Sequence, residues 1–114
     1  MSITTQAIAP GFAVAAQLSA TQMTDAAAQG FKTVVNNRPD GEGGPDQPLS
    51  QTIAAAAQAN GLHYVYLPVV SGAITPEQAQ ALRERLQSVP KPVLAFCRSG
   101  ARSAQLFALA QAGS

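Results

Sequence analysis

The sequence predicts an α/β protein with a mostly parallel sheet and helices on its faces. Three observations predict this class. Short apolar segments alternate with segments of helical pattern, glycine- and proline-rich stretches separate them, and the order is strand–helix repeated four times. Because such units join parallel strands through right-handed crossovers, the helices must pack on the sheet. A chain of 114 residues holds one compact domain, so a single domain over residues 1–114 is expected.

Four strands are expected. The segment "PVLAF" is wholly apolar, as a strand covered on both faces should be. The segment "FKTVVN" is rich in β-branched residues, which favour strands. The expected strands span residues 12–17, 31–36, 62–69 and 92–96.

Four helices are expected between and after these strands. Ser19 and Gln22 have the spacing of a capping box, and Gly61 suits a left-handed helix stop. Thr75 supplies another cap, with a proline at the first helical position after it. The helices are expected from the 19–22 box to Gly30, over 51–60, from Thr75 to near Pro90, and over 101–112.

The composition excludes several classes of function. Charged residues make up 11% of the chain, the formal net charge is +1, and the two Lys and five Arg are scattered, which argues against a nucleic-acid partner. No apolar run reaches the length of a membrane span, and the first basic residue is Lys32, so neither a membrane role nor a signal peptide is expected. A cytoplasmic protein is therefore predicted.

Cysteine and histidine usage restricts the chemistry further. Cys97 is the only cysteine, which excludes an internal disulfide and a paired-cysteine zinc site. His63 is the only histidine and is expected to be a packed or surface residue. We therefore expect no metal and no cofactor, and a lone nucleophilic thiolate becomes the hypothesis to test.

The stretch "FCRSGARS", residues 96–103, is the strongest candidate site. A short loop between a buried strand and a helix directs several backbone N–H groups inward, and the helix adds the positive end of its dipole. Gly100 permits a positive φ there. Such donors bind anions and also stabilise a thiolate, so the pKa of Cys97 should be lowered. The opposing interpretation, a cysteine that merely packs as a small apolar residue, does not account for the neighbouring glycine and arginines.

Each residue of this stretch has an expected role. Cys97 is the nucleophile, and Arg102 can place two donors on a bound oxyanion. Arg98 adds positive charge, and Ser103 can donate to the sulfur. The expected catalytic residues are Cys97 and Arg102, and the expected anion-binding residues are Arg98, Ser99, Gly100, Ala101 and Ser103.

A second group of candidates follows the second expected strand. Asn37, Arg38 and Asp40 could border the pocket, although "RPDG" is equally explained as turn chemistry. Glu42 and Asp46, further along the same glycine-rich loop, are expected to be solvated charges.

The cysteine loop resembles two known groups of enzymes. "CRSGAR" looks like the six-residue active-site loop of rhodaneses, the sulfurtransferases in which the cysteine carries a persulfide. It also resembles the loop of protein tyrosine and dual-specificity phosphatases. These phosphatases place five residues between Cys and Arg, whereas this sequence has four, with Phe96 where they usually have His.

Most of the chain is similar to the bacterial beta-lactamase-hydrolase-like phosphatase-like domain family. The similarity covers "NNRPDGEGGPDQPLS", "GLHYVYLPVVSGAITPEQ" and "PVLAFCRSGARS". It implies a cysteine-phosphatase-like fold used for sulfur chemistry in hydrogen sulfide metabolism. It also implies a persulfide dioxygenase, fused or separate, as a partner.

From these features we expect a cysteine-dependent sulfurtransferase. Cys97 would take sulfur from a small anionic donor, thiosulfate or a persulfide, and pass it from a Cys97 persulfide to a thiol acceptor or cyanide. The alternatives are a phosphatase-like hydrolase acting through a phosphocysteine and a non-catalytic anion-binding or redox-sensing module. Phosphate ester hydrolysis is expected to be weak, because residues 62–75 contain no carboxylate that could serve as the general acid. Asp40 or Asp46 could supply one only if the long loop bent over Cys97.

Overall fold

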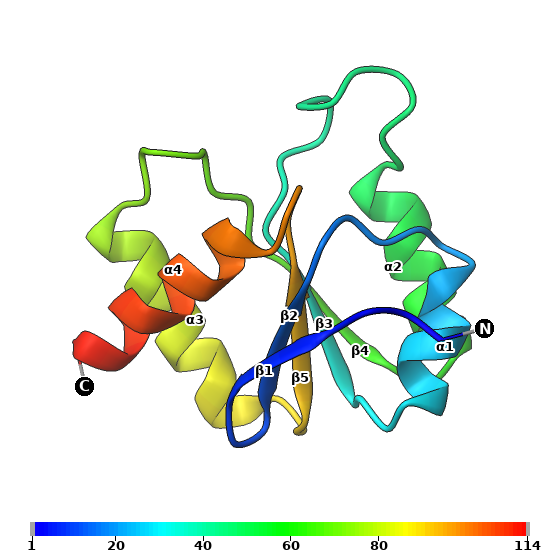
Figure 1. Cartoon of the computed structure of the whole chain (residues 1–114), viewed down its shortest axis with the longest axis horizontal. Coiled ribbons are helices and arrows are strands. Elements are labelled where there is room, and N and C mark those ends of the chain that lie inside the picture. Colours follow the sequence, from blue (N-terminus) through cyan, green and yellow to red (C-terminus); the bar gives the residue numbers. More distant parts are fainter. Residues whose placement is uncertain (1, 114) are drawn as a thin grey trace.

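One twisted five-stranded sheet forms the centre of the molecule. In the computed structural model, which describes residues 2–113, the strand order is β1-β2-β5-β3-β4 (Figure 1). Strands β2, β5, β3 and β4 are parallel, and β1 pairs antiparallel with β2 at the edge. The strands are β1 (Gln6–Ala9), β2 (Phe12–Ala15), β3 (Thr33–Asn36), β4 (His63–Tyr66) and β5 (Val93–Phe96).

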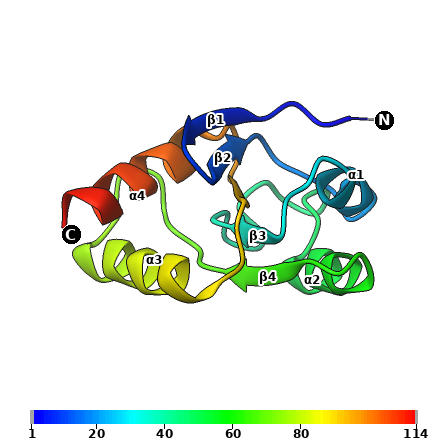
Figure 2. The same ribbon diagram turned by 90° about the horizontal axis from the view of Figure 1, so that it is seen from below.

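Four helices cover the two faces of this sheet. Helices α1 and α2 lie on one face and α3 and α4 on the other, so the molecule has three layers (Figure 2). This arrangement confirms the predicted α/β class with a mostly parallel sheet. The helices are α1 (Gln22–Ala28), α2 (Ser50–Ala59), α3 (Pro76–Ser88) and α4 (Ala101–Ala112).

Two of the expected helix signals are present as predicted. The N–H of Gln78 donates to Thr75 Oγ1 at 3.1 Å, and the N–H of Thr75 donates to Gln78 Oε1 at 2.9 Å, which completes a capping box at the start of α3. After α2, Gly61 has φ +75°, the left-handed conformation expected of a residue that ends a helix. These local signals therefore placed both helix ends correctly.

The first expected helix begins later than predicted. α1 starts at Gln22, and no side chain caps its first N–H groups. The N–H of Ser19 does donate to Gln22 Oε1 at 2.9 Å, but the Ser19 hydroxyl also bonds to this oxygen at 3.3 Å. Because the hydroxyl is used there and not on the helix N–H groups, residues 19–21 form a turn before the helix.

The strands also differ in detail from the predictions. β1 was not expected, because its residues are half-exposed or exposed and show no alternation of apolar and polar side chains. The other four strands lie within the expected ranges 12–17, 31–36, 62–69 and 92–96 but are shorter. Their pairing ends at Ala15, Asn36, Tyr66 and Phe96, where the chains diverge into loops.

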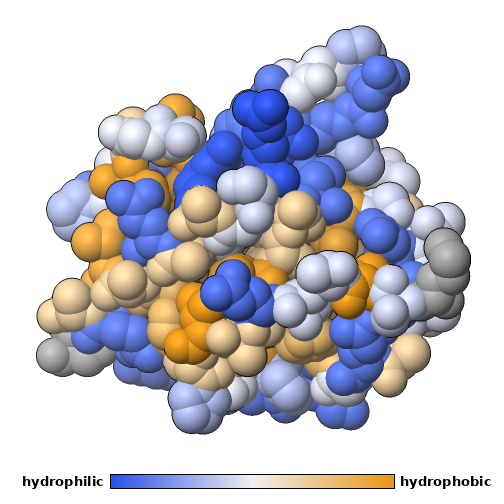
Figure 3. All heavy atoms as spheres, viewed as in Figure 1, coloured by the Kyte–Doolittle hydropathy of each residue, from blue (hydrophilic) through white to orange (hydrophobic). Residues whose placement is uncertain are grey.

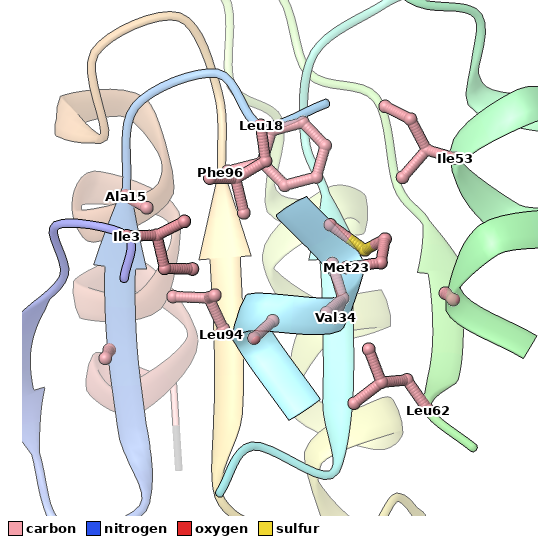
Figure 4. Close-up of a cluster of buried hydrophobic side chains, with 12 residues drawn as sticks. Ile3, Ala15, Leu18, Met23, Val34, Ile53, Leu62, Leu94 and Phe96 are labelled. Carbon is pink, nitrogen blue, oxygen red and sulfur yellow. The ribbon is translucent and has the colours of Figure 1, made fainter. Parts of the chain in front are cut away.

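The central strand β5 is buried on both faces, as its apolar sequence predicted. Leu94 and Phe96 belong to the core beneath α1 and α2, where Met23 and Ile53 pack with them (Figure 4). The alternate residues of β5, Val93 and Ala95, belong to the second core beneath α3 and α4. Strand β5 therefore ends at Phe96 between two packed layers, which fixes the position of Cys97, the first residue of the loop that follows.

Candidate active site

Three loops leave the same edge of the sheet. The parallel register places Asn36 of β3 opposite both Phe96 of β5 and Tyr66 of β4. The segments that begin at Asn37, Leu67 and Cys97 therefore start side by side at the carboxyl ends of the strands (Figure 1). This edge is where open α/β sheets form their sites.

The loop from Cys97 to the start of α4 is folded around the sulfur atom. Cys97 is buried, with 1% of its surface exposed, and the N–H of Gly100 donates to its Sγ at 3.1 Å. Gly100 has φ +96°, so the chain can turn its N–H groups inward before α4 begins at Ala101. The sequence thus builds the expected amide-lined loop with a helix N-terminus behind it.

These donors change the acidity of the thiol. Burial by itself raises the pKa of Cys97, because it disfavours the charged form. Hydrogen bonds from the backbone N–H groups of Ser103, Ser99 and Gly100 lower it. The donors prevail, and the pKa of Cys97 lies below its usual range. A larger fraction of the sulfur is therefore the nucleophilic thiolate at neutral pH.

The end of β2 supports this loop from behind. A Cβ atom on Gly100 would lie 3.3 Å from the carbonyl oxygen of Ala15, which is a tight contact. The N–H of Gln17 donates to the carbonyl of Arg98 at 3.3 Å. Gly100 is therefore required both for its backbone conformation and for the close approach of the neighbouring strand.

A buried polar network joins the three loops beneath the sulfur. Ser103 and Asn37 are fully buried, and the Ser103 hydroxyl donates to Asn37 Oδ1 at 2.8 Å. Asn37 Nδ2 donates to the carbonyl of Leu67 at 2.8 Å, and the N–H of Val69 donates to the carbonyl of Asn37 at 3.0 Å. Asn37 therefore lies below the site as a brace, and not on the rim where it was expected.

Arg102 is held by two acceptors and keeps one donor unused. Its Nη1 and Nη2 donate to the two carboxylate oxygens of Glu42 at 2.9 and 3.0 Å, and Nη1 also donates to the carbonyl of Val69 at 3.0 Å. The side chain is 9% exposed. Its Nε is buried and has no hydrogen-bond partner among the described residues. A buried donor without an acceptor costs free energy, so this N–H is suited to donate to an oxygen of a bound anion.

Glu42 links two arginines, which the sequence did not suggest. Arg38 Nε donates to Glu42 Oε1 at 2.9 Å, the same oxygen that accepts from Arg102 Nη2. The hydrogen bonds from Arg102, opposed by burial and aided by Arg38, hold the pKa of Glu42 below its usual range. Glu42 is exposed, as a solvated charge should be, but the prediction missed its pairing; its spacing of four residues from Arg38 was the one local signal of that pairing.

These side chains surround one cavity of about 650 Å³. Hydrophilic side chains gather at the end of the molecule where the three loops lie (Figure 3). The cavity brings together five of the expected residues of the cysteine loop and one of the expected rim. It is lined by Cys97, Arg98, Ser99, Ala101 and Arg102, by Arg38 and Glu42, and by Val70, Ser71 and Gln105, of which Glu42 and the last three were not predicted.

Asp40 does not reach this cavity. Its carboxylate accepts the N–H of Ser50 at 2.8 Å, at the start of α2, and its own N–H donates to Tyr66 Oη at 2.9 Å. Asp46 is exposed and is not among the residues that line the cavity. The long loop therefore does not bend so as to bring either aspartate over Cys97.

Elsewhere the described residues offer less chemistry. A second cavity, of about 490 Å³, lies at the opposite edge of the sheet near the stacked rings of Phe12 and Phe107, and none of its lining residues is a cysteine, a serine or a carboxylate. Within residues 2–113, no three His, Cys, Asp or Glu side chains form a group that could hold a metal ion. In the same range, no helix has the length and apolar character needed to cross a bilayer.

The α/β fold with a thiolate loop and an arginine after its central parallel strand is cysteine-phosphatase-like, as a similar solved structure shows. A family model described as "Beta-lactamase hydrolase-like protein, phosphatase-like domain" matches residues 4–114. The chain belongs to this family, which confirms the resemblance found in the sequence.

Known proteins similar to this chain support the same assignment. It is 34% identical over 99 residues to a beta-lactamase hydrolase-like protein of Xylella fastidiosa (strain Temecula1) and 39% identical over 85 residues to one of Agrobacterium fabrum (strain C58). These matches cover 87% and 75% of the chain but only 23% and 20% of the relatives. The crystal structure of a candidate phosphatase of Neisseria meningitidis Z2491 has a TM-score of 0.82 and 27% identity, covering 90% of this chain and 72% of that one.

The expectation of a sulfurtransferase acting through a Cys97 persulfide was wrong. The matched family model is described as phosphatase-like, and the similar solved structure is that of a candidate phosphatase. The shared loop explains the error, because a thiolate, inward amides and an arginine serve either reaction. The surroundings of Cys97 are more positively charged than a persulfide requires. Three arginines, Arg38, Arg98 and Arg102, line the cavity and suit a multiply charged oxyanion.

Proposed function

We propose that this domain is a cysteine-dependent phosphatase that transfers a phosphoryl group to Cys97 and then to water. The observation that carries the proposal is Arg102 on the wall of the Cys97 cavity, with its buried Nε lacking an acceptor. A phosphoryl oxygen supplies that acceptor while the phosphorus atom faces the sulfur. The family description and the similarity to the Neisseria protein support the same reaction class.

In the first step the Cys97 thiolate attacks phosphorus. The S–P bond forms, the bond from phosphorus to the leaving oxygen breaks, and the leaving group departs with the bonding electron pair. The N–H groups of the loop and the guanidinium of Arg102 stabilise the negative charge on the equatorial oxygens, because they are already oriented before the substrate binds. The fixed loop thus supplies nucleophile and charge stabilisation from one short segment.

In the second step water attacks the phosphocysteine. The S–P bond breaks and the thiolate is restored. Orthophosphate is released, and it carries both protons of the water molecule. The lowered pKa of Cys97 favours this step too, because a stabilised thiolate is a better leaving group.

The test is hydrolysis of p-nitrophenyl phosphate by the purified chain. Turnover should be readily measured, and Cys97→Ser should reduce it to the background rate, because a serine hydroxyl is not ionised in this range of pH. Acid-quenched samples should contain a phosphoryl adduct on Cys97 by intact-protein mass spectrometry. The matched control is Ser88→Ala, which removes a hydroxyl from an exposed position of α3 outside the cavity.

Absence of turnover and of the adduct would refute the proposal. If phosphate binds tightly but is never transferred, the domain is the anion-binding or redox-sensing module that the sequence left open. The roles of the loop residues, the single domain over residues 1–114, the cytoplasmic location and a persulfide dioxygenase partner stay predictions.

A further inference from the structure

The cavity that contains Cys97 has a single carboxylate on its walls. Among its described lining residues only Glu42 is acidic, and Glu42 is paired with both Arg102 and Arg38. These pairs hold the pKa of Glu42 below its usual range, so it carries no proton to donate at neutral pH. The resting site therefore contains no carboxylic acid to protonate a leaving oxygen.

The other carboxylates of the long loop do not fill this role. Asp40 is used at the start of α2, where it accepts the N–H of Ser50. Asp46 does not line the cavity. A general acid normally contributes about 10²- to 10⁴-fold to the rate, and its benefit is largest when the leaving oxygen is a poor leaving group. The site is thus suited to a leaving group that departs without a proton.

The same cavity contains more positive charge than one phosphoryl group requires. Arg102 follows the cysteine loop directly and is placed for the transferred group. Arg38 and Arg98 lie further out on the wall, and Arg98 is exposed. The three arginines and the one glutamate around Cys97 carry a net charge of +2. Arg38 is also oriented by Gln17, which accepts from its Nη1 at 3.1 Å.

We propose that the substrates are phosphoanhydrides: Cys97 takes the terminal phosphoryl group of a diphosphate, and Arg38 and Arg98 bind the phosphate that leaves. The inference rests on the proposed phosphatase function and adds the substrate class. The leaving phosphate competes with Glu42 for Arg38, so the ion pair seen here marks the position of the second anionic group.

The chemistry balances without an acid. The thiolate (charge 1−) and a diphosphate monoester (3−) give phosphocysteine (2−) and a phosphate monoester (2−); the S–P bond forms and the bridging O–P bond breaks. The leaving oxygen keeps the electron pair. A phosphate monoester has a second pKa of about 6, whereas a phenol has a pKa of about 10. At neutral pH the phosphate monoester departs as a stable dianion. The departure of a phenoxide, in contrast, is accelerated strongly by protonation.

Phenyl diphosphate and phenyl phosphate provide a matched pair of substrates. We expect kcat/KM for phenyl diphosphate to exceed that for phenyl phosphate by at least about 10²-fold, the lower range of the contribution of a missing acid. ³¹P NMR should show equal amounts of orthophosphate and phenyl phosphate from the diphosphate, with phenyl phosphate accumulating. p-Nitrophenyl phosphate, whose leaving group needs little protonation, reports the phosphatase reaction itself.

Arginine variants test the assignment of the second subsite. The double variant Arg38→Gln/Arg98→Gln should reduce the preference for phenyl diphosphate by at least about tenfold, because the charge-assisted bonds to the leaving phosphate are lost. Arg85→Gln is the matched control. Arg85 is exposed on α3, outside the cavity, so its variant should keep the wild-type preference.

The outcomes separate this inference from the function on which it rests. Hydrolysis of p-nitrophenyl phosphate with equal use of the two phenyl substrates would overturn the phosphoanhydride assignment and leave the phosphatase intact. A preference that the double variant keeps in full would overturn the assignment of Arg38 and Arg98. If p-nitrophenyl phosphate is not hydrolysed either, the phosphatase proposal fails, and the substrate class fails with it.

Discussion

Two loops meet at the cavity, and they are held in place in different ways. The short loop after β5 is fixed by its backbone: Gly100 turns at φ +96°, α4 begins at the next residue, and the N–H groups converge on Cys97. The long loop after β3 is fixed by side chains, because Glu42 bonds to Arg102, sixty positions away in the sequence. The first loop supplies a preformed anion cradle, and the second supplies charges that a ligand can rearrange.

The difference predicts which substitutions are severe. Changes in the short loop alter the geometry around the sulfur directly, since its donors are part of the main chain. Changes in the long loop remove one contact at a time from a partly exposed network, and each contact contributes modestly. Four substitutions test this contrast.

The largest effect is expected for Arg102→Lys. Lysine keeps the charge but cannot present the planar fork of donors that Arg102 places on Glu42 and on a bound anion. We expect kcat for p-nitrophenyl phosphate to fall by about 10²- to 10³-fold, the usual cost of a lost oxyanion donor. Arg85→Lys on the exposed side of α3 serves as the control. A kcat within about threefold of wild type would show that Arg102 does not bind the transferred group.

Gly100→Val should disturb the short loop and lower the stability of the fold. A β-branched residue at φ +96° is strained, and its Cβ would press on the Ala15 carbonyl, so the free energy of unfolding should fall by about 1–3 kcal/mol. Alkylation of Cys97 by iodoacetamide near neutral pH should also slow. Gly44→Val is the control, because Gly44 has φ +85° on the long loop with open space around it. If both variants alkylate at the same rate, the loop geometry does not tune the thiol.

Ser103→Ala should change the pH dependence of the thiol. The Ser103 N–H lowers the pKa of Cys97, and the Ser103 hydroxyl donates to the buried Asn37, which holds this residue in place beside the sulfur. In the wild type, the alkylation rate should rise with pH through an inflection below that of an unfolded cysteine, because only the thiolate reacts. The variant should move this inflection upward and lose about 1–3 kcal/mol of stability, since Asn37 Oδ1 loses a buried donor. Ser88→Ala, at an exposed position of α3, should leave the inflection where it is.

The smallest effect is expected for Gln47→Ala in the long loop. Gln47 accepts the N–H of Gly43 at 2.6 Å and donates to the carbonyl of Pro39 at 2.9 Å, so it braces the loop that presents Glu42. We expect a loss of about 1 kcal/mol in stability and a higher KM, with the alkylation profile of Cys97 unchanged. Gln51→Ala, exposed on α2, is the control. A shifted alkylation profile would show that the two loops are not independent.

The same contrast explains what the sequence could predict. The four expected strands, the cap at Thr75 and the cysteine loop depend on residues close together in the chain, and the structure has them within the ranges where they were expected. The positions of Asn37 and Glu42 depend mainly on Ser103 and Arg102, which lie 66 and 60 positions further along the chain, and no local pattern encodes these two contacts. β1 was missed because its residues at the exposed edge lack the alternation that marks a half-buried strand.

A local sequence pattern could not predict the reaction class either. The cysteine loop has the same physical requirements whether it receives sulfur or phosphorus. The absence of a carboxylate in residues 62–75 was interpreted as an argument for sulfur. Within a phosphatase-like family, the same absence is better explained by the leaving group, which is why it supports the phosphoanhydride proposal.

Because of the position of β5 in the sheet, the site can form only when the fold is complete. β2 and β3 do not pair with each other; each pairs with β5, which comes last of the five strands in the chain. A growing chain therefore cannot join its two half-sheets until residues 93–96 have been made, and Cys97 follows at once. Such long-range closure makes folding slow and cooperative. A nascent or truncated chain that ends before β5 has neither a continuous sheet nor a nucleophile, so partly made molecules carry no stray reactive thiol.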